Sequence, residues 1–167
     1  MNTRTDMSDK ITEEFSYEFT DRMGRDFQAR VCIDADQLVI HVYYGKYRAG
    51  HMFCTIRGDE LMLGDIFLEN AVELLGVPIR RFVCRLFRLP KPTISFRRNG
   101  LGSEIMEFLF ETVSNRGIKK IVGQVPVKGV AENPKLLDWY RSMGFSVTPK
   151  HDDKLWVAEI RRPINLS

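Results

Sequence analysis

The chain has 167 residues, a length that predicts a single domain. Hydrophobic residues make up 44% and charged residues 28%, an ordinary globular composition that excludes a disordered or low-complexity protein. The first ten residues contain no apolar stretch and charges interrupt every apolar run, so we expect no signal peptide and no membrane span. The three cysteines have no disulfide or metal-site spacing, which predicts reduced thiols, a cytoplasmic location and no metal.

The net charge of +3 is unevenly distributed along the chain. Residues 1–70 contain 8 basic and 13 acidic side chains, whereas residues 71–130 contain 11 basic and 4 acidic ones. No acid occurs between Glu73 and Glu104, and the basic residues in that interval are Arg80, Arg81, Arg85, Arg88, Lys91, Arg97 and Arg98. This concentration indicates either a solvated surface or a local anionic ligand.

The first part of the chain predicts an antiparallel β-meander. Five runs alternate apolar and polar side chains, as half-buried strands do, and polar turn residues separate them. The expected strands cover residues 15–19, 27–33, 38–44, 47–56 and 61–69. Residues 71–96 then read as an insertion, with a short helical turn over 71–75 and a basic, apolar flap over 78–96.

The second part of the chain predicts helices between strands. Apolar spacing indicates a helix over 102–116, ended by Gly117, and a strand over 118–126. A second helix is expected over 133–143, because Asn133 and Pro134 are typical first residues of a helix. A closing hairpin is expected over 145–148 and 155–161. Since the helices come late, the fold class is α+β, with a mixed, mostly antiparallel sheet flanked by helices.

One segment predicts an anion site at the start of the first helix. Gly100 and Gly102 open this helix, and two arginines stand just before them. A helix N-terminus presents unpaired amides and partial positive charge, and glycine lets a phosphate approach the backbone. The segment is neither a dinucleotide-binding fingerprint, because Ile105 replaces the third glycine, nor a P-loop, because GK[ST] is missing. A plain capped turn remains the alternative.

Two motifs resemble those of a known family. Arg97-x-x-Gly100-x-Gly102 resembles the pyrophosphate loop of the GNAT superfamily of acyl-CoA N-acyltransferases. Asn133-x-x-Leu136-x-x-x-Tyr140-x-x-x-Gly144-Phe145 is similar to the second motif of that family, a helix that delivers a tyrosine. The resemblance covers roughly residues 61–161 and implies one GNAT-like domain over 1–167, with 71–96 inserted as a flap.

The chain departs from the family in two places. Family members place two helices after the first strand, where this sequence predicts strands, so the acceptor site cannot be carried over. The fourth family strand normally runs almost directly into the pyrophosphate loop. Here we assign that strand to 61–69, with 93–96 as the alternative.

The resemblance implies transfer of an acetyl or other acyl group from acetyl-CoA to an amine by direct attack on the thioester. Coenzyme A would be held by the loop and by Asn133 at its pantetheine arm. The residues expected to bind it are Arg97, Arg98, Asn99, Gly100, Leu101, Gly102, Ser103 and Asn133. In this family the tyrosine equivalent to Tyr140 is placed to protonate the leaving thiolate; a buried core aromatic is the alternative.

The attacking amine must lose a proton, and a carboxylate on the central strand could take it. Asp65 and Glu69 are four residues apart on one predicted strand, so both should point to the same face. Each has an alternative role as a solvated strand residue. The acceptor itself is not identified by the sequence.

Other readings stay open for the basic 80–98 segment. It could serve a nucleic-acid-binding module, since arginines and lysine alternate there with phenylalanines, although nucleic acid is the less favoured partner. The protein could also be a non-catalytic, coenzyme A-binding interaction protein. Within the acyltransferase reading, the flap is either an acceptor lid or an element of a homodimer, with the homodimer favoured.

Overall fold

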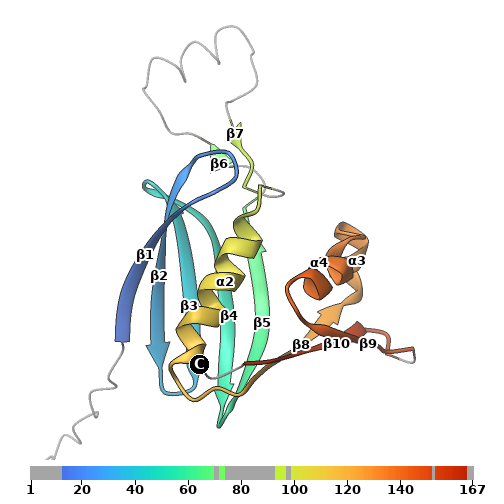
Figure 1. Ribbon diagram of the computed structural model, residues 1–167. Helices are drawn as coiled ribbons and strands as arrows, with labels where there is room; N and C mark the ends of the chain where they lie inside the picture. Colours follow the sequence, from blue (N-terminus) through green and yellow to red (C-terminus); the bar gives the residue numbers. More distant parts are fainter. Residues whose placement is uncertain (1–12, 70–71, 74–92, 97–98, 152, 165–167) are drawn as a thin grey trace, which may run out of the picture.

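A computed structural model of the chain describes residues 13–69, 72–73, 93–96, 99–151 and 153–164. Its main element is an eight-stranded sheet with the order β1-β2-β3-β4-β5-β8-β10-β9. Helix α2 (Leu101–Ser114) lies across one face of the sheet, and two shorter helices lie beside β8 and β10 (Figure 1). All neighbouring strands are antiparallel except β5 and β8, so the predicted mixed, mostly antiparallel α+β sheet is confirmed.

The first five strands form the expected meander. They are β1 (Glu13–Thr20), β2 (Asp26–Asp34), β3 (Gln37–Tyr44), β4 (Tyr47–Arg57) and β5 (Glu60–Leu68). In β3, the alternate residues Leu38, Ile40 and Val42 are fully buried, and they belong to the same hydrophobic core as α2 residues such as Ile105 and Leu109. The strand period of two therefore fixes which face of the meander meets the helix.

The short helical turn expected over 71–75 is wrong for the residues that the structure describes there. Strand β6 (Val72–Glu73) pairs antiparallel with β7 (Thr93–Ile94) in a separate two-stranded sheet. A local apolar pattern does not reveal a partner strand 20 residues further along the chain. Residues 93–96 are therefore not the central strand, and 61–69 is the correct assignment. Residues 74–92 lie outside the described residues, so the flap, its lid role and the homodimer stay predictions.

The second half of the fold follows the expected order with one addition. After α2 come β8 (Lys120–Pro126), α3 (Val127–Glu132), α4 (Leu136–Ser142), β9 (Ser146–Pro149) and β10 (Trp156–Pro163). Helix α3 is not predicted by the sequence, because its six residues include a glycine and are followed by Asn-Pro. Asn133 consequently lies between the two helices, and the prediction that it starts the second helix is wrong: α4 begins at Leu136.

Strand β5 changes its surroundings half-way along its length. Residues Glu60–Leu63 pair with β4 on one side and with β8 on the other. A register shift then follows on the β4 side, at Gly64. A Cβ built there would lie 2.8 Å from the carbonyl oxygen of Phe53, so the bulge has room only for glycine. Beyond it, β5 pairs with β4 alone while β8 pairs with β10 alone, and the two strands diverge (Figure 1).

Candidate active site

The divergence of β5 and β8 forms an opening in the sheet, and the predicted site residues lie around it or at its end. The β5–β8 ladder ends at the Leu63–Gly123 pair. Further along, Gln124 and Val125 pair only with β10. Where two parallel strands separate, their backbone groups have no partner strand on that side, which suits the binding of an extended polar chain.

The start of α2 lies at the end of this opening. Gly100 precedes the helix with a φ of +85°, a conformation that glycine adopts without strain. The amides of Ser103 and Glu104 donate to the Gly100 carbonyl oxygen at 2.9 and 3.1 Å. Among the described residues, none accepts a hydrogen bond from the amides of Leu101 or Gly102. The positive end of the helix dipole at this point favours an anion, and the two amides have no acceptor among the described residues.

The structure brings together most of the predicted cofactor-binding residues. Asn99 to Ser103 form one continuous turn into α2, whereas Arg97 and Arg98 lie outside the described residues. Asn133 stands apart, in the connection between α3 and α4, where its side-chain oxygen accepts a hydrogen bond from the Lys135 amide at 3.3 Å. Its carbonyl also accepts the Leu136 amide at 2.9 Å, so Asn133 orders the chain that leads into α4.

Trp139 connects the two helices at this point. Its indole N–H donates to the Ser103 hydroxyl oxygen at 3.0 Å. A Cβ added to Gly102 would lie 3.6 Å from the Trp139 ring, which is ordinary contact distance. Trp139 is half-buried, and its hydrogen bond joins it to the first turn of α2. The indole therefore fixes α4 against the helix start, a role that no local sequence pattern signals.

Tyr140 follows on the same helix and is only 8% exposed. Its ring packs against Trp139 and Phe145, with centroids 4.8 and 5.5 Å away. Burial, and after it the negative charge of Asp65, raises the pKa of Tyr140 to about 12. The phenol therefore keeps its proton at neutral pH and can only donate it or share it in a hydrogen bond.

The two predicted acids lie at different places along the opening. Asp65 follows the Gly64 bulge, is exposed, and acts electrostatically on Tyr140. Glu69 comes after the last residue of β5, where its amide donates to Ala49 and its carbonyl accepts the Phe96 amide. At about 3.3 Å per residue the two are roughly 13 Å apart, so they cannot serve the same reacting atom. Only Asp65 is brought close to Tyr140.

Cys54 lies behind the same bulge and is not a reactive group. Its side chain is fully buried, and the Gly64 backbone hydrogen bonds to its thiol. Burial raises the pKa of Cys54 to about 12, far above the range of a nucleophilic thiolate. Among the described residues there is also no group of three or more His, Cys, Asp or Glu side chains that could hold a metal ion.

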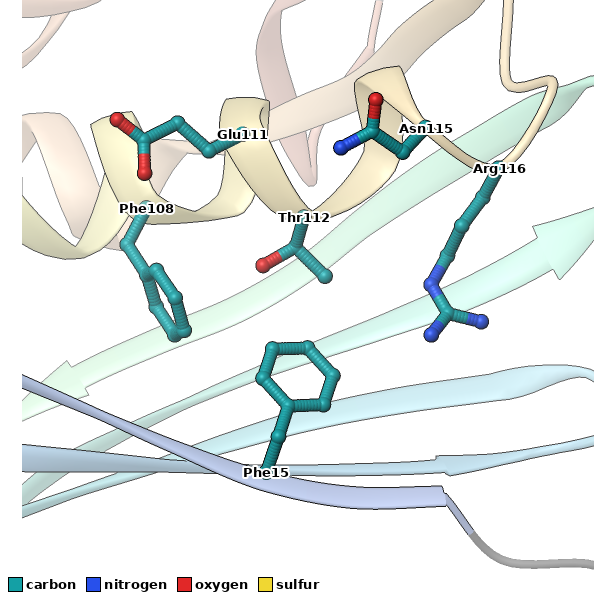
Figure 2. Close-up of a pocket in the computed structure, with 6 residues that line it drawn as sticks. All are labelled: Phe15, Phe108, Glu111, Thr112, Asn115 and Arg116. Carbon is teal, nitrogen blue, oxygen red and sulfur yellow. The ribbon is translucent and has the colours of Figure 1, made fainter.

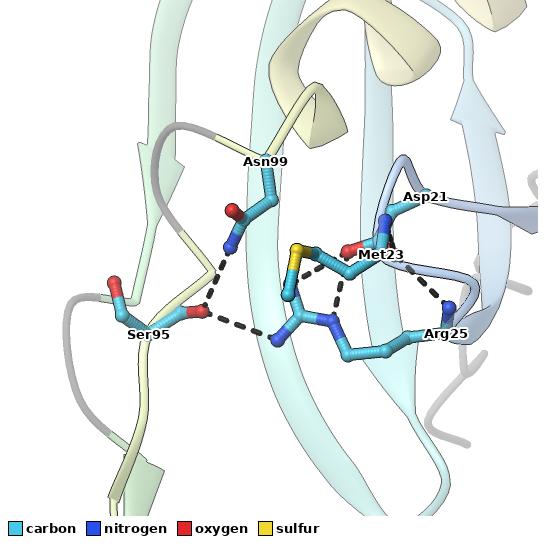
Figure 3. A network of polar contacts seen from close by, with 5 residues as sticks. All are labelled: Asp21, Met23, Arg25, Ser95 and Asn99. Atoms are coloured by element: carbon cyan, nitrogen blue, oxygen red, sulfur yellow. Dashed lines mark hydrogen bonds and ion pairs between the residues drawn. The ribbon is translucent and has the colours of Figure 1, made fainter.

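The turn between β1 and β2 supports the loop that leads into α2 (Figure 3). The Asp21 carboxylate is buried and accepts hydrogen bonds from the Arg25 side chain, at 2.6 and 2.8 Å, and from two backbone amides of the turn. The Arg25 guanidinium in turn donates to the Ser95 carbonyl at 3.2 Å, which also accepts from the Asn99 side chain. Arg25 also lies over the ring of Phe96.

The charge state of Asp21 follows from these contacts. Burial alone would raise its pKa, but the hydrogen bonds from Arg25 and from the turn amides outweigh burial, so the pKa is lowered. Asp21 is therefore ionised at neutral pH and holds Arg25 in place. The sequence reasoning missed this support, because the ion pair becomes visible only once β1 is paired with β2.

A hollow lies at the other end of α2 (Figure 2). It has a volume of about 460 Å³ and is lined by Phe15, Phe108, Glu111, Thr112, Asn115 and Arg116. Phe15 comes from β1, and the remaining residues come from the last turns of α2 and the residues after it. The hollow is therefore separate from the opening between β5 and β8, and it contains none of the predicted site residues.

Comparison with solved structures identifies this arrangement. The chain superposes on the ribosomal-protein-S18-alanine N-acetyltransferase of Escherichia coli with a TM-score of 0.53 and 18% identity, covering 80% of this chain and 72% of that one. The chain has the GNAT fold. A complex of the PaiA N-acetyltransferase of Thermoplasma acidophilum with coenzyme A matches with a TM-score of 0.52 and 12% identity, over 77% of this chain and 61% of that one.

An acetyltransferase of Thermus thermophilus matches similarly, with a TM-score of 0.51 and 13% identity over 78% of this chain and 66% of that one. No family model and no curated protein matches the sequence. The fold resemblance inferred from the two motifs is thus confirmed by structure alone. In the described part of the chain, no helix is long and apolar enough to cross a membrane.

Proposed function

We propose that this protein is an acyl-CoA N-acyltransferase that transfers an acetyl group from acetyl-CoA to an amine. The observation that carries the proposal is the opening between β5 and β8, with the α2 start at its end and Tyr140 close to Asp65. The GNAT fold and a neighbour solved with coenzyme A support it. In this reading the amides of Leu101 and Gly102 at the helix start bind the diphosphate, and the pantetheine arm lies between the diverging strands.

The chemistry requires two proton movements. The amine attacks the thioester carbonyl carbon, its nitrogen gives up a proton, the C–S bond breaks, and the thiolate of coenzyme A leaves. Asp65, directly or through a water, is the group best placed to accept the amine proton. Tyr140, which stays protonated up to about pH 12, donates a hydrogen bond to the departing sulfur, and the thiolate then takes a proton from solvent. Since a thiol has a pKa near 8.5, the phenol acts mainly by stabilising the thiolate.

Glu69 and Asn133 take other parts in this proposal. Glu69 lies beyond the end of β5, near the loop rather than beside Tyr140, and is the less suitable base. Asn133 would contact the pantetheine arm from the α3–α4 connection. The nucleic-acid alternative depends on residues 80–98, most of which lie outside the described residues, and no contact of the described residues favours it.

Binding is the first experiment. Thermal unfolding is measured with acetyl-CoA, NAD or ATP at equal concentrations, because a ligand that binds only the folded protein raises the midpoint. The proposal expects a shift with acetyl-CoA that the other two nucleotides do not match. A panel of amines, from small polyamines to peptides with free N-termini or lysines, is then tested for acetylation and release of coenzyme A. An equal shift with all three nucleotides would indicate general phosphate binding instead.

A further inference from the structure

The β1–β2 turn places one more cation at the start of α2. The Arg22 amide donates to the Asn99 carbonyl at 3.4 Å, so the backbone of the turn touches the loop. A Cβ built on Gly100 would lie 3.0 Å from both Cγ and Nε of Arg22. The arginine stem therefore packs directly on the residue that precedes the helix, although it is 78 positions earlier in the sequence.

The guanidinium of Arg22 has no partner within the described part of the protein. None of the described residues forms a hydrogen bond or an ion pair with it, and the side chain is exposed. The nearest acid in the sequence, Asp21, is fully engaged by Arg25 and by two amides of the turn. The turn is thus held rigidly by one arginine while the other is presented to solvent above the loop.

The surroundings specify what this arginine can bind. Its stem packs on Gly100, the residue before α2, so the guanidinium lies at the positive end of the helix dipole, where the Leu101 and Gly102 amides have no acceptor among the described residues. An anion bound at that point would accept hydrogen bonds from the backbone amides and from the Arg22 guanidinium. Arginine is suited to this because its planar group binds phosphate through two parallel hydrogen bonds.

We propose that Arg22 is a binding residue for the diphosphate of coenzyme A, contributed by a turn outside both recognised motifs. This inference rests on the proposed function, since it assigns a further contact at the same cofactor site. It also gives Gly100 a second reason to lack a side chain. A Cβ would be strained at a φ of +85° and would displace the Arg22 stem from the loop.

The test is a set of affinities measured by isothermal titration calorimetry with coenzyme A, dephospho-coenzyme A and pantetheine. Arg22→Ala should weaken coenzyme A binding about tenfold to a hundredfold, which corresponds to one or two charge-assisted hydrogen bonds. Arg22→Lys should recover part of the loss, because lysine keeps the charge but not the paired donors. The matched control is Arg57→Ala, which removes one exposed charge at the opposite end of β4 and should change affinity less than about twofold.

Comparison of the three ligands shows which phosphate group Arg22 contacts. Dephospho-coenzyme A keeps the diphosphate and lacks only the 3′-phosphate, so the same loss with both nucleotides supports the proposal. A loss confined to coenzyme A would move the contact to the 3′-phosphate and overturn the assignment to the diphosphate. Pantetheine, which has no phosphate, should bind wild type and Arg22→Ala equally.

Failure of the proposed function can be told apart from failure of this inference. If wild type binds coenzyme A and Arg22→Ala binds it equally well, the role of Arg22 is overturned and the acyltransferase proposal stands. If wild type binds no coenzyme A, both fall. Because Arg22 is exposed, the variant should fold, and its unfolding midpoint should equal that of wild type.

Discussion

The two halves of strand β5 have different pairing partners. In the first half, residues Glu60–Leu63 pair on both sides, and Leu61 is fully buried. In the second half, after the Gly64 bulge, the strand pairs only with β4 and ends beside the start of α2. The closed half stabilises the fold, whereas the open half leaves backbone and side chains available to a ligand. The end of the β5–β8 ladder therefore separates the part of the strand that holds the fold together from the part where we propose that the ligand binds.

The largest effect on activity should come from a change at Tyr140, which we place beside the open half of β5. Tyr140→Phe removes only the phenol oxygen and keeps the ring that packs on Trp139 and Phe145. We expect turnover to fall about 10²–10⁴-fold, as is usual when a proton donor is lost, with little change in acetyl-CoA affinity. The measurement is steady-state kinetics beside calorimetry. Equal turnover in the two proteins would make Tyr140 a packing residue.

The closed half should respond in the opposite way. Leu61→Ala opens a cavity at a fully buried position and should lower the free energy of unfolding by about 2–5 kcal/mol. Turnover per folded molecule and acetyl-CoA affinity should stay close to those of wild type. Urea unfolding and active-site titration measure the two quantities separately. A loss of affinity without a loss of stability would show that the two halves of β5 are not distinct.

Asp65 lies just past the Gly64 bulge, so its replacement tests the open half of β5 separately from the closed half. Asp65→Asn should reduce turnover roughly 10²-fold by removing the base, without lowering stability, since the side chain is exposed. The same change removes a negative charge that raises the pKa of Tyr140, so that pKa should fall below about 12 and stay above its ordinary value, because burial, the larger cause, is unchanged. Ultraviolet titration of the tyrosines follows this shift. Glu69→Gln is the matched control, and a larger loss there would reverse the assignment of the base.

The smallest effect concerns the turn that supports the loop. Asp21→Asn weakens the ion pair with Arg25 and should cost about 1–3 kcal/mol of folding stability at pH 7. Since the folded pKa of Asp21 is lowered, its contribution is complete above the unfolded value of about 3.9 and is lost as the pH falls below it. Wild type and variant should therefore converge in stability at the acid end of a urea-unfolding series. A constant difference across that series would contradict the role of the carboxylate.

The sequence predicts the meander and α2 correctly because burial alternates there with the strand and helix periods. In β3, Leu38, Ile40 and Val42 carry that signal without ambiguity. Helix α3 and the β6–β7 pair are missed for a physical reason. Helix α3 is short and contains a glycine, and the β6–β7 pair joins residues about 20 positions apart. Tertiary contacts therefore determine both elements, and no local sequence pattern predicts them.

The candidate site likewise contains features that the sequence predicts and features that it does not predict. The turn from Asn99 to Ser103 and the tyrosine of α4 follow from two short motifs, since each motif is contiguous in the chain. No motif predicts the contacts that Arg22, Arg25 and Trp139 make with the loop. These contacts form only after β1 pairs with β2 and α4 packs on α2. Contacts between distant segments are not visible in a single sequence, and in this protein they surround the loop that leads into α2.

The central claim is that the open end of β5 and the start of α2 form a coenzyme A site. The most direct test is a calorimetric titration of acetyl-CoA into wild type and into Gly102→Val. Gly102 is not in a strained conformation, and a Cβ there would meet only Trp139 and Leu68 at 3.6 and 3.8 Å, so a valine variant should fold. We predict saturable binding to wild type and none to the folded variant, because a valine side chain would crowd the helix start to which we assign the diphosphate. Unchanged affinity in folded Gly102→Val, or no binding to wild type, would contradict the account.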